Sequence, residues 1–199
     1  AEQLVILNPD ALMDPLLLAT LLGTVADDIG FIEARQLPVE HPKEYEPATG
    51  DTAWGSTACA MIPRALFNAL NGFDSETFFL YCDDVDFSWR VRLAGQRVVY
   101  QPAARLFHDK RLTSAGDWPS SNAERYFSAE AALLLAYKYS RPDVLNQNLA
   151  AFRMSADPDL KRALATFEER KASGRLPQCI DPENKVATFV AGNYTEHRY

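Results

Sequence analysis

The stretch FFLYCDDVDFSWRVR, residues 78–92, leads from an apolar segment into a predicted helix through three closely spaced carboxylates, Asp83, Asp84 and Asp86. Carboxylates this close repel one another, which raises the pKa of at least one of them toward a range suited to proton transfer. The dipole at a helix N-terminus acts in the opposite sense, because it stabilises the ionised form. The cluster is therefore either a set of helix-capping acids or a catalytic group. Arg90, one turn after Asp86, favours a structural ion pair for that residue.

Strand and helix patterns alternate on both sides of this stretch. The helix that begins at the acidic cluster ends near Gly95, and a strand follows at residues 96–101, closed by Pro102. Upstream, Asp14 is a favourable N-cap with Pro15 at the first helical position. Further strands are predicted at residues 4–7, 31–35 and 58–62, and a further helix at residues 64–70. This alternation over the first 110 residues predicts an α/β fold.

The two ends of the chain differ in character. The continuous apolar run at residues 4–7 is typical of a buried parallel strand, which needs neighbours on both sides, so we expect the chain to be a piece of something longer. Toward the other end, three helices are predicted at residues 123–139, 144–154 and 160–173. The sequence therefore predicts an α/β part, residues 1–121, and a C-terminal, mainly helical extension, residues 122–199.

The charge of the chain argues against one class of partner. The formal net charge is −7, whereas a nucleic-acid-binding face needs clustered Lys and Arg, so we expect no nucleic-acid partner. Basic residues gather locally at Arg105, Lys110 and Arg111, beside His108. A patch of this size fits a phosphate group better than a polymer.

Cysteine usage and hydropathy indicate a location. The three cysteines are odd in number and widely spaced, so we expect free thiols in a reducing compartment and not a disulfide framework or a zinc site. No apolar run approaches the roughly 20 residues that span a bilayer. We also expect no signal peptide, since the chain opens on AEQLVILNPD without a basic stretch. These features predict a cytoplasmic protein.

Two further places carry residues suited to metal binding. Asn8 and Asp10 follow directly on the first predicted strand and offer two oxygen ligands to a hard cation such as Mg²⁺ or Mn²⁺. The alternative is that Asn8-Pro9-Asp10 is only a turn, which these residue types favour. His108 follows another predicted strand, and its neutral ring is a metal ligand, although a lone histidine is more often structural.

Three segments, in one unbroken order over roughly residues 3–110, resemble the family 2 glycosyltransferases, and among them the rhamnosyltransferases. LNPDA, residues 7–11, resembles the short metal motif of that family, with Asn8 in place of the first acid. WGSTACAMIPRALFNALNGFD, residues 54–74, resembles its acceptor-side strand, helix and Gly-Phe-Asp turn. FFLYCDDVDFSWRVRLAGQRVVYQPAARLFH, residues 78–108, resembles its acidic base motif and the strand that ends in histidine.

The resemblance implies a fold and a reaction. The fold would be GT-A, a mixed sheet flanked by helices, of which this chain resembles the metal- and acceptor-binding second half. The reaction would be inverting transfer of a sugar from a nucleotide-sugar donor to a hydroxyl of a glycan or glycolipid acceptor, as in polysaccharide biosynthesis. Asp84 would be the general base and Asp83 its neighbour in the acceptor site. Asp86 is expected to hold the helix.

The resemblance also implies ligand-binding residues. Asp10, with Asn8 and His108, would hold Mg²⁺ or Mn²⁺ against the donor diphosphate. The acceptor loop would be Trp54, Gly55 and Ser56, and Lys110 with Arg111 would contact the donor phosphates.

The sequence departs from the family in one respect, and this leaves alternatives open. The strand, loop and helix that bind the nucleoside in family members would precede Ala1, so we expect another segment or a partner chain, such as a second copy in a homodimer, to supply that pocket. The alternative function is a non-catalytic sugar-binding or assembly module derived from such a half-domain. A peripheral position at the inner face of a membrane is compatible with the enzyme. A generic α/β domain with acidic helix caps would make the ordered motifs a coincidence.

Overall fold

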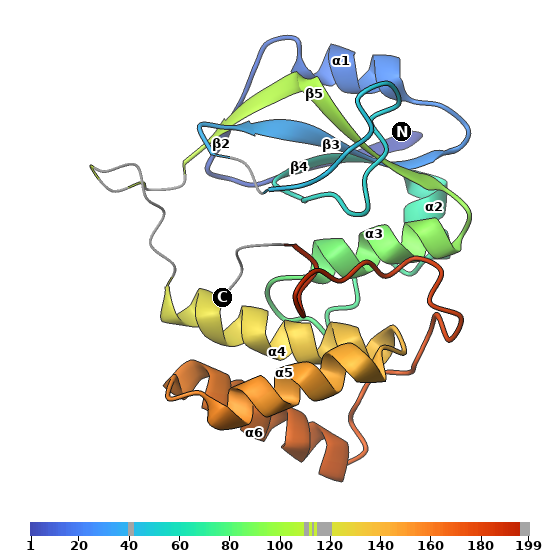
Figure 1. Ribbon diagram of the computed structural model, residues 1–199. Helices are drawn as coiled ribbons and strands as arrows, with labels where there is room; N and C mark the ends of the chain where they lie inside the picture. Colours follow the sequence, from blue (N-terminus) through green and yellow to red (C-terminus); the bar gives the residue numbers. More distant parts are fainter. Residues whose placement is uncertain (40–41, 110–111, 113, 115–120, 196–199) are drawn as a thin grey trace. The chain divides into compact units, whose positions relative to one another are not determined.

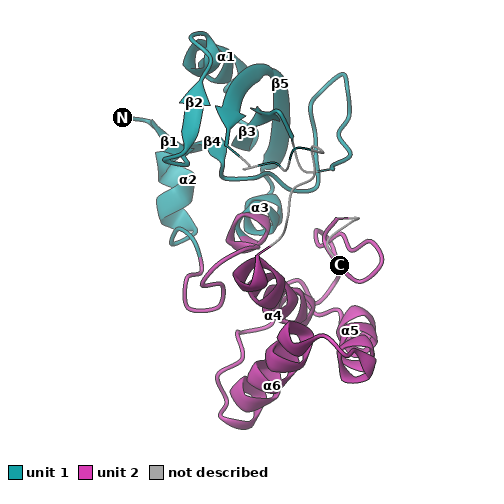
Figure 2. Ribbon diagram, turned by 90° about the vertical axis from the view of Figure 1, so that its left-hand side faces the viewer, with its two compact units in different colours: residues 1–73, 87–119 teal, residues 74–86, 120–199 magenta. Residues whose placement is uncertain are grey.

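The computed structural model describes residues 1–39, 42–109, 112, 114 and 121–195. It divides into two compact units, coloured separately in Figure 2: unit 1 comprises Ala1–Phe73 and Phe87–Pro119, and unit 2 comprises Asp74–Asp86 and Ser120–Tyr199. Helix α3 (Asp83–Leu93) passes from unit 2 to unit 1 between Asp86 and Phe87. In this division residues 74–86 belong with the C-terminal helices, and the expected boundary at residue 121 stays a prediction.

Unit 1 is built on a five-stranded mixed sheet in the order β1-β4-β3-β5-β2. The central strands β3 and β5 are parallel to each other, and the remaining pairings are antiparallel. The predicted α/β mixed sheet flanked by helices is therefore confirmed. The strands are β1 (Gln3–Leu7), β2 (Ala11–Met13), β3 (Ile29–Leu37), β4 (Cys59–Pro63) and β5 (Arg97–His108).

Helices cover both faces of this sheet (Figure 1). Because neighbouring side chains on a strand point to opposite faces, Phe31 and Ile32 of β3 enter two different clusters of the core. On one face α1 (Leu17–Thr24) contributes Leu17 and Leu21. On the other, α2 (Arg64–Ala69) and the second half of α3 supply the apolar side chains Leu66, Phe67, Phe87 and Val91.

The prediction that residues 4–7 form a buried parallel strand is wrong. β1 is antiparallel to β4 and is the first strand in the order of the sheet, so it has one neighbour among the described strands. Its side chains are only partly buried, and that of Val5 is 42% exposed. An apolar run of four residues identifies a strand but does not distinguish one neighbour from two.

Two other predicted boundaries also differ. The strand that Pro102 was expected to close continues as β5 to His108. Its register with β3 steps from Ala34–Gln101 to Arg35–Arg105, so that Pro102 lies in a bulge, where its missing N–H leaves no ladder bond unmade. The helix expected from Pro15 begins instead at Leu17.

Unit 2 holds the three helices that the sequence predicts, α4 (Asn122–Lys138), α5 (Pro142–Met154) and α6 (Pro158–Ala172) (Figure 1). Their starts follow local chemistry: Ser121 accepts a hydrogen bond from the Glu124 N–H, and Asp157 accepts one from the Asp159 N–H. α4 packs against both of the other helices. In the part of the chain that the structure describes, no helix has the length and hydropathy to cross a bilayer.

Candidate functional site

The turn Asn8-Pro9-Asp10 is placed against the end of β5 by the pairing of the short strand β2. The Asn8 N–H donates to the Ala58 carbonyl (3.0 Å), and the Ala11 N–H donates to the Asn8 carbonyl (3.2 Å). Ala11, the first residue of β2, lies opposite His108, the last residue of β5. The turn that the sequence offered as an alternative is therefore present, and it carries Asp10 to the histidine.

His108 is the centre of this arrangement. Its Nε2 lies 3.3 Å from Asp10 Oδ1 and 3.3 Å from Asn8 Nδ2, while its Nδ1 lies 2.9 Å from Gln36 Oε1. The imidazole side chain is 9% exposed and the Asp10 side chain 55% exposed, so the histidine is buried behind a carboxylate that faces solvent. The three residues predicted for metal binding thus meet in unit 1, although His108 lies 100 positions after Asn8 in the chain.

Asp10 Oδ1 and His108 Nε2 are close enough to bind the same divalent cation. Two ligands in neighbouring positions of an octahedral Mg²⁺ site, each about 2.1 Å from the ion, are separated by about 3 Å, close to the 3.3 Å between His108 Nε2 and Asp10 Oδ1. Among the described residues, no group of three or more His, Cys, Asp or Glu side chains is placed so that it could hold a metal ion. A site with one carboxylate and one imidazole therefore leaves positions for phosphate oxygens and water.

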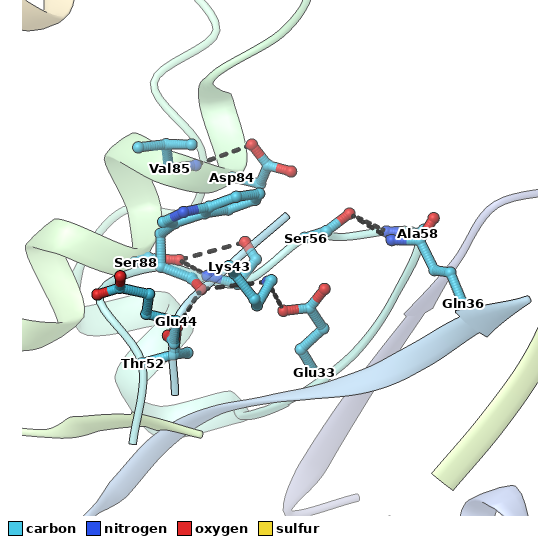
Figure 3. Close-up of polar contacts among 12 residues, drawn as sticks. Glu33, Gln36, Lys43, Glu44, Thr52, Ser56, Ala58, Asp84, Val85 and Ser88 are labelled. Carbon is cyan, nitrogen blue, oxygen red and sulfur yellow. Dashed lines mark hydrogen bonds and ion pairs between the residues drawn. The ribbon is translucent and has the colours of Figure 1, made fainter. Parts of the chain in front are cut away.

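The predicted acceptor loop, Trp54-Gly55-Ser56, is fixed in unit 1 by buried contacts. Ser56 Oγ accepts hydrogen bonds from Gln36 Nε2 and from the Ala58 N–H, each at 3.2 Å (Figure 3). The Gly55 N–H donates to Ser88 Oγ at 3.0 Å. A Cβ atom on Gly55 would lie 2.4 Å from the Phe31 ring, so only glycine fits there.

Trp54 is almost fully buried, 4% exposed, and a lysine lies over its ring. Lys43 Nζ is 4.0 Å from the ring centroid, forms an ion pair with Glu33 and donates to the Trp54 carbonyl at 3.3 Å (Figure 3). None of the sequence motifs indicates the pair Lys43–Glu33. One feature of the sequence could have indicated it: Glu33 is a single acid inside the apolar strand segment FIEA, residues 31–34. An acid buried in such a strand needs a cationic partner.

The acidic residues Asp83, Asp84 and Asp86 lie in the first turn of α3. Asp84 Oδ1 accepts a hydrogen bond from the Val85 N–H at 2.8 Å (Figure 3). Burial raises the pKa of Asp83, and the charge of Asp86 acts in the same sense, against hydrogen bonds from the backbone N–H groups of Asp83 and Asp84. The cluster does contain a carboxyl with a raised pKa, but burial is a larger cause than repulsion.

Backbone strain precedes this pair. Tyr81 and Cys82 have φ angles of 65° and 62°, in the left-handed region that bulky residues rarely adopt. Each residue in that region costs of order 1–3 kcal/mol, and such residues concentrate at functional sites. The strain therefore supports a functional interpretation of the acids that follow.

Asp86 is fully buried, and two residues of unit 2 hold it: Lys138, the last residue of α4, and Tyr139, which follows it. Lys138 Nζ lies 2.6 Å from Asp86 Oδ1 and 2.7 Å from Asp74 Oδ2, and the Tyr139 hydroxyl donates to Asp86 Oδ1 at 3.0 Å. The sequence gave no indication of Lys138, and the expected pairing of Asp86 with Arg90 stays a prediction. Arg90 donates to the Leu70 carbonyl at 2.8 Å.

The basic residues predicted for phosphate contact fall in two groups. Lys110 and Arg111 lie outside the residues that the structure describes. Arg105 lies on β5, with its guanidinium 3.4 Å from Asp14 Oδ2.

Comparison with known proteins finds partial sequence relatives. No family model matches the chain. N-acetylglucosaminyl-diphospho-decaprenol L-rhamnosyltransferase of Mycobacterium tuberculosis (strain H37Rv) is 36% identical over 80 residues, which are 40% of this chain and 25% of that protein. Rhamnosyltransferase WbbL of Escherichia coli (strain K12) is 31% identical over 98 residues, 46% of this chain and 37% of that protein. The matched part thus spans about a quarter to a third of these curated relatives.

Two solved structures are similar to the chain, and of these two only the first has a TM-score above 0.5 and bears on the fold. The structure of GalNAc-T7 with UDP, GalNAc and Mn²⁺ matches 88% of this chain and 42% of its own, with a TM-score of 0.55 and 12% identity. The mannosyltransferase PcManGT of Pyrobaculum calidifontis, in complex with GDP-Man and Mn²⁺, matches 92% of this chain and 52% of its own, with a TM-score of 0.46 and 16% identity. The predicted resemblance to rhamnosyltransferases and the GT-A-like fold are confirmed.

Proposed function

Because the chain is a sequence relative of rhamnosyltransferases with a GT-A-like fold, we propose that it is the cation- and acceptor-binding part of an inverting, family 2 glycosyltransferase. The donor is a nucleotide-sugar and the acceptor a hydroxyl of a glycan or glycolipid, with a rhamnosyl or related hexosyl group transferred. The observation that carries the proposal is the convergence of Asn8, Asp10 and His108 in unit 1. In this proposal a further segment or a partner chain, such as a second copy in a homodimer, supplies the nucleoside pocket.

Asp10 and His108 hold the Mg²⁺ or Mn²⁺ ion, with Asn8 at its side. The support is the 3.3 Å separation of Asp10 Oδ1 and His108 Nε2 and the exposure of the carboxylate, which leaves room for the donor diphosphate. When bound, the ion supplies Lewis-acid stabilisation of the charge that develops on the departing nucleoside diphosphate. Lys110 and Arg111 are proposed to contact the same diphosphate, on the basis of sequence alone.

Asp84 is the general base in this proposal. Its carboxylate takes the proton from the acceptor hydroxyl as that oxygen bonds to the anomeric carbon, and the nucleoside diphosphate leaves with the electron pair of the broken bond, which inverts the configuration. Asp83 supports the acceptor, and its raised pKa fits a carboxyl held where water is partly excluded. The strained residues Tyr81 and Cys82 fix the start of the helix that carries both acids.

The loop Trp54-Gly55-Ser56 shapes the acceptor site. The proposal is supported by the hydrogen bonds that hold this loop in place. The Gly55 N–H donates to Ser88 Oγ, and Ser56 Oγ accepts from Gln36 Nε2 and the Ala58 N–H. A cytoplasmic location, where nucleotide-sugars are made, agrees with the proposed reaction.

A sugar-transfer assay, run with any segment or partner that completes the nucleoside pocket, tests the base assignment. Asp84→Asn should lower kcat by at least about 100-fold, because general-base catalysis contributes roughly 10²–10⁴-fold. Asp143→Asn is the matched control, since Asp143 also lies in the first turn of a helix, α5, and should leave the rate unchanged. An unchanged rate for Asp84→Asn would remove the base role. Sugar binding without transfer in the wild-type protein would favour the non-catalytic module.

A further inference from the structure

We infer that Gln36, held in place by Ser56, is a positioning residue that sets the tautomer and orientation of His108 so that its Nε2 lone pair faces the cation position. This inference rests on the proposed cation site and deepens it. Neither Gln36 nor this role for Ser56 follows from the sequence motifs.

The three side chains form a buried chain of hydrogen bonds. Gln36, Ser56 and His108 are 2%, 5% and 7% exposed. Gln36 Nε2 donates to Ser56 Oγ at 3.2 Å, and Gln36 Oε1 lies 2.9 Å from His108 Nδ1. A polar side chain buried to this degree in the central strand β3 is unfavourable unless both ends of its amide have partners, and here both do.

The direction of these bonds determines the histidine tautomer. Ser56 Oγ accepts from the Ala58 N–H and from Gln36 Nε2, so the nitrogen end of the amide faces the serine and the oxygen end faces the imidazole. A carbonyl oxygen only accepts, so His108 Nδ1 carries the hydrogen. In the neutral ring the lone pair is then on Nε2.

The surroundings of Nε2 complete the inference. Asn8 Nδ2 is 3.3 Å away and donates to this lone pair, a hydrogen bond that a bound cation would replace, and Asp10 Oδ1 is also 3.3 Å away. A lone pair that faces a carboxylate is stabilised when a cation lies between them. Metal-binding histidines generally donate their second ring N–H to a carbonyl or carboxylate, and loss of that partner typically weakens metal affinity 10–100-fold.

The test measures Mn²⁺ affinity of the purified chain by the electron paramagnetic resonance signal of free Mn²⁺. Gln36→Met keeps the length of the side chain but removes both hydrogen-bonding ends, and should weaken binding 10–100-fold. Gln36→Glu keeps an acceptor for Nδ1–H and should bind within a few-fold of wild type. Ser56→Ala, which frees the amide to rotate, should fall between them.

Asn148→Leu serves as the control, because Asn148 is a buried amide in unit 2, bonded to the Gly192 carbonyl at 2.8 Å. It should lower stability without changing Mn²⁺ affinity. Wild-type affinity in Gln36→Met, together with a large loss in Asp10→Ala, would overturn the role of Gln36 alone. Wild-type affinity in Asp10→Ala would overturn the proposed cation site itself.

A measurement on the wild-type chain keeps the inference testable if Gln36→Met does not fold. Nitrogen-15 spectra of the histidine ring, recorded with saturating Mg²⁺, should show hydrogen on Nδ1 of His108 and none on Nε2. Hydrogen on Nε2 under these conditions would overturn the inference.

Discussion

At the start of α3, burial and strain fall on adjacent residues. Tyr81 and Cys82 adopt left-handed backbone angles, and Asp83, directly after them, is a carboxyl whose pKa is raised by burial. A folded protein retains such unfavourable features where function needs them. Because its pKa is raised in the folded state, Asp83 reduces stability at neutral pH.

The effect of Asp83 on stability follows from the direction of its pKa. The folded pKa lies above the unfolded value of about 3.9, so the contribution to stability is fully present below that pH and is lost as pH rises through the folded pKa. Asp83→Asn removes the ionisation and should raise the free energy of unfolding near pH 7. Urea titrations at pH 7 and pH 3.5 check this, and the gain should vanish at pH 3.5. A loss of stability at pH 7 would contradict it.

At the scale of elements, α4 holds the segment 74–86 through one lysine. The Lys138 side chain is 7% exposed and bridges the carboxylates of Asp74 and Asp86, the second of which has no exposure. Burial acts to raise the pKa of Asp74, but hydrogen bonds from Lys138 and Thr77 outweigh it, so the pKa lies below its ordinary value. Lys138 therefore contributes to stability by neutralising the carboxylates of Asp74 and Asp86.

Lys138→Met should destabilise the chain by about 3–5 kcal/mol, because it leaves buried carboxylate charge without its cation. Chemical denaturation measures this, and Lys185→Met is the control. Lys185 pairs with Glu183 on the surface, where both side chains are at least 65% exposed, so its loss should change stability by less than about 1 kcal/mol. Equal effects of the two substitutions would show that Lys138 is not a buried bridge.

The ion pair of Lys138 with Asp74 should also make the free energy of unfolding depend on pH. Since the folded pKa of Asp74 is depressed, its contribution is present above the unfolded pKa, about 3.9, and is lost as pH falls through the folded value. The free energy of unfolding should therefore decrease on acidification below about pH 4 in the wild type. This decrease should be smaller in Lys138→Met, and an identical slope in both proteins would contradict the assignment.

Elements with complete local signals could be predicted from the sequence. The helices α4, α5 and α6 start and stop within two residues of the predicted bounds, because caps, prolines and helix-forming residues act over one turn. β1 and β5 were misjudged, because sheet order and the bulge at Pro102 depend on strands far along the chain. The partnership of Lys138 with Asp86, 52 positions apart, has no local signal of any kind.

The candidate site shows the same limit. Asn8, Asp10 and His108 could be proposed from their places after strands and from the family resemblance. Gln36 could not be proposed in this way, because a glutamine inside a strand is part of no motif. It comes close to His108 only because β3 pairs with β5. The contact of Lys43 with the Trp54 ring likewise depends on the path of the loop between β3 and β4, which carries both residues.

At the scale of the whole molecule, the two units should respond differently to a cation. All the proposed ligands belong to unit 1, where β3 and β5 carry Gln36 and His108. Binding to the folded state alone stabilises by about 2.7 kcal/mol when the ligand is at 100 times its Kd. Mg²⁺ or Mn²⁺ should therefore slow amide hydrogen exchange in β2, β3 and the end of β5, and leave α5 and α6 unchanged.

Hydrogen exchange followed by mass spectrometry, with and without the ion, checks this in the purified chain. Asp10→Ala should abolish the protection, because it removes the solvent-facing carboxylate beside His108. Asp143→Asn, an acid of α5 in unit 2, should leave it intact. Protection confined to the helices α4–α6 would place the cation in unit 2 and refute the site. Protection of both units in the wild type, lost in Asp10→Ala, would instead mean that the site in unit 1 is correct and that the units unfold as one.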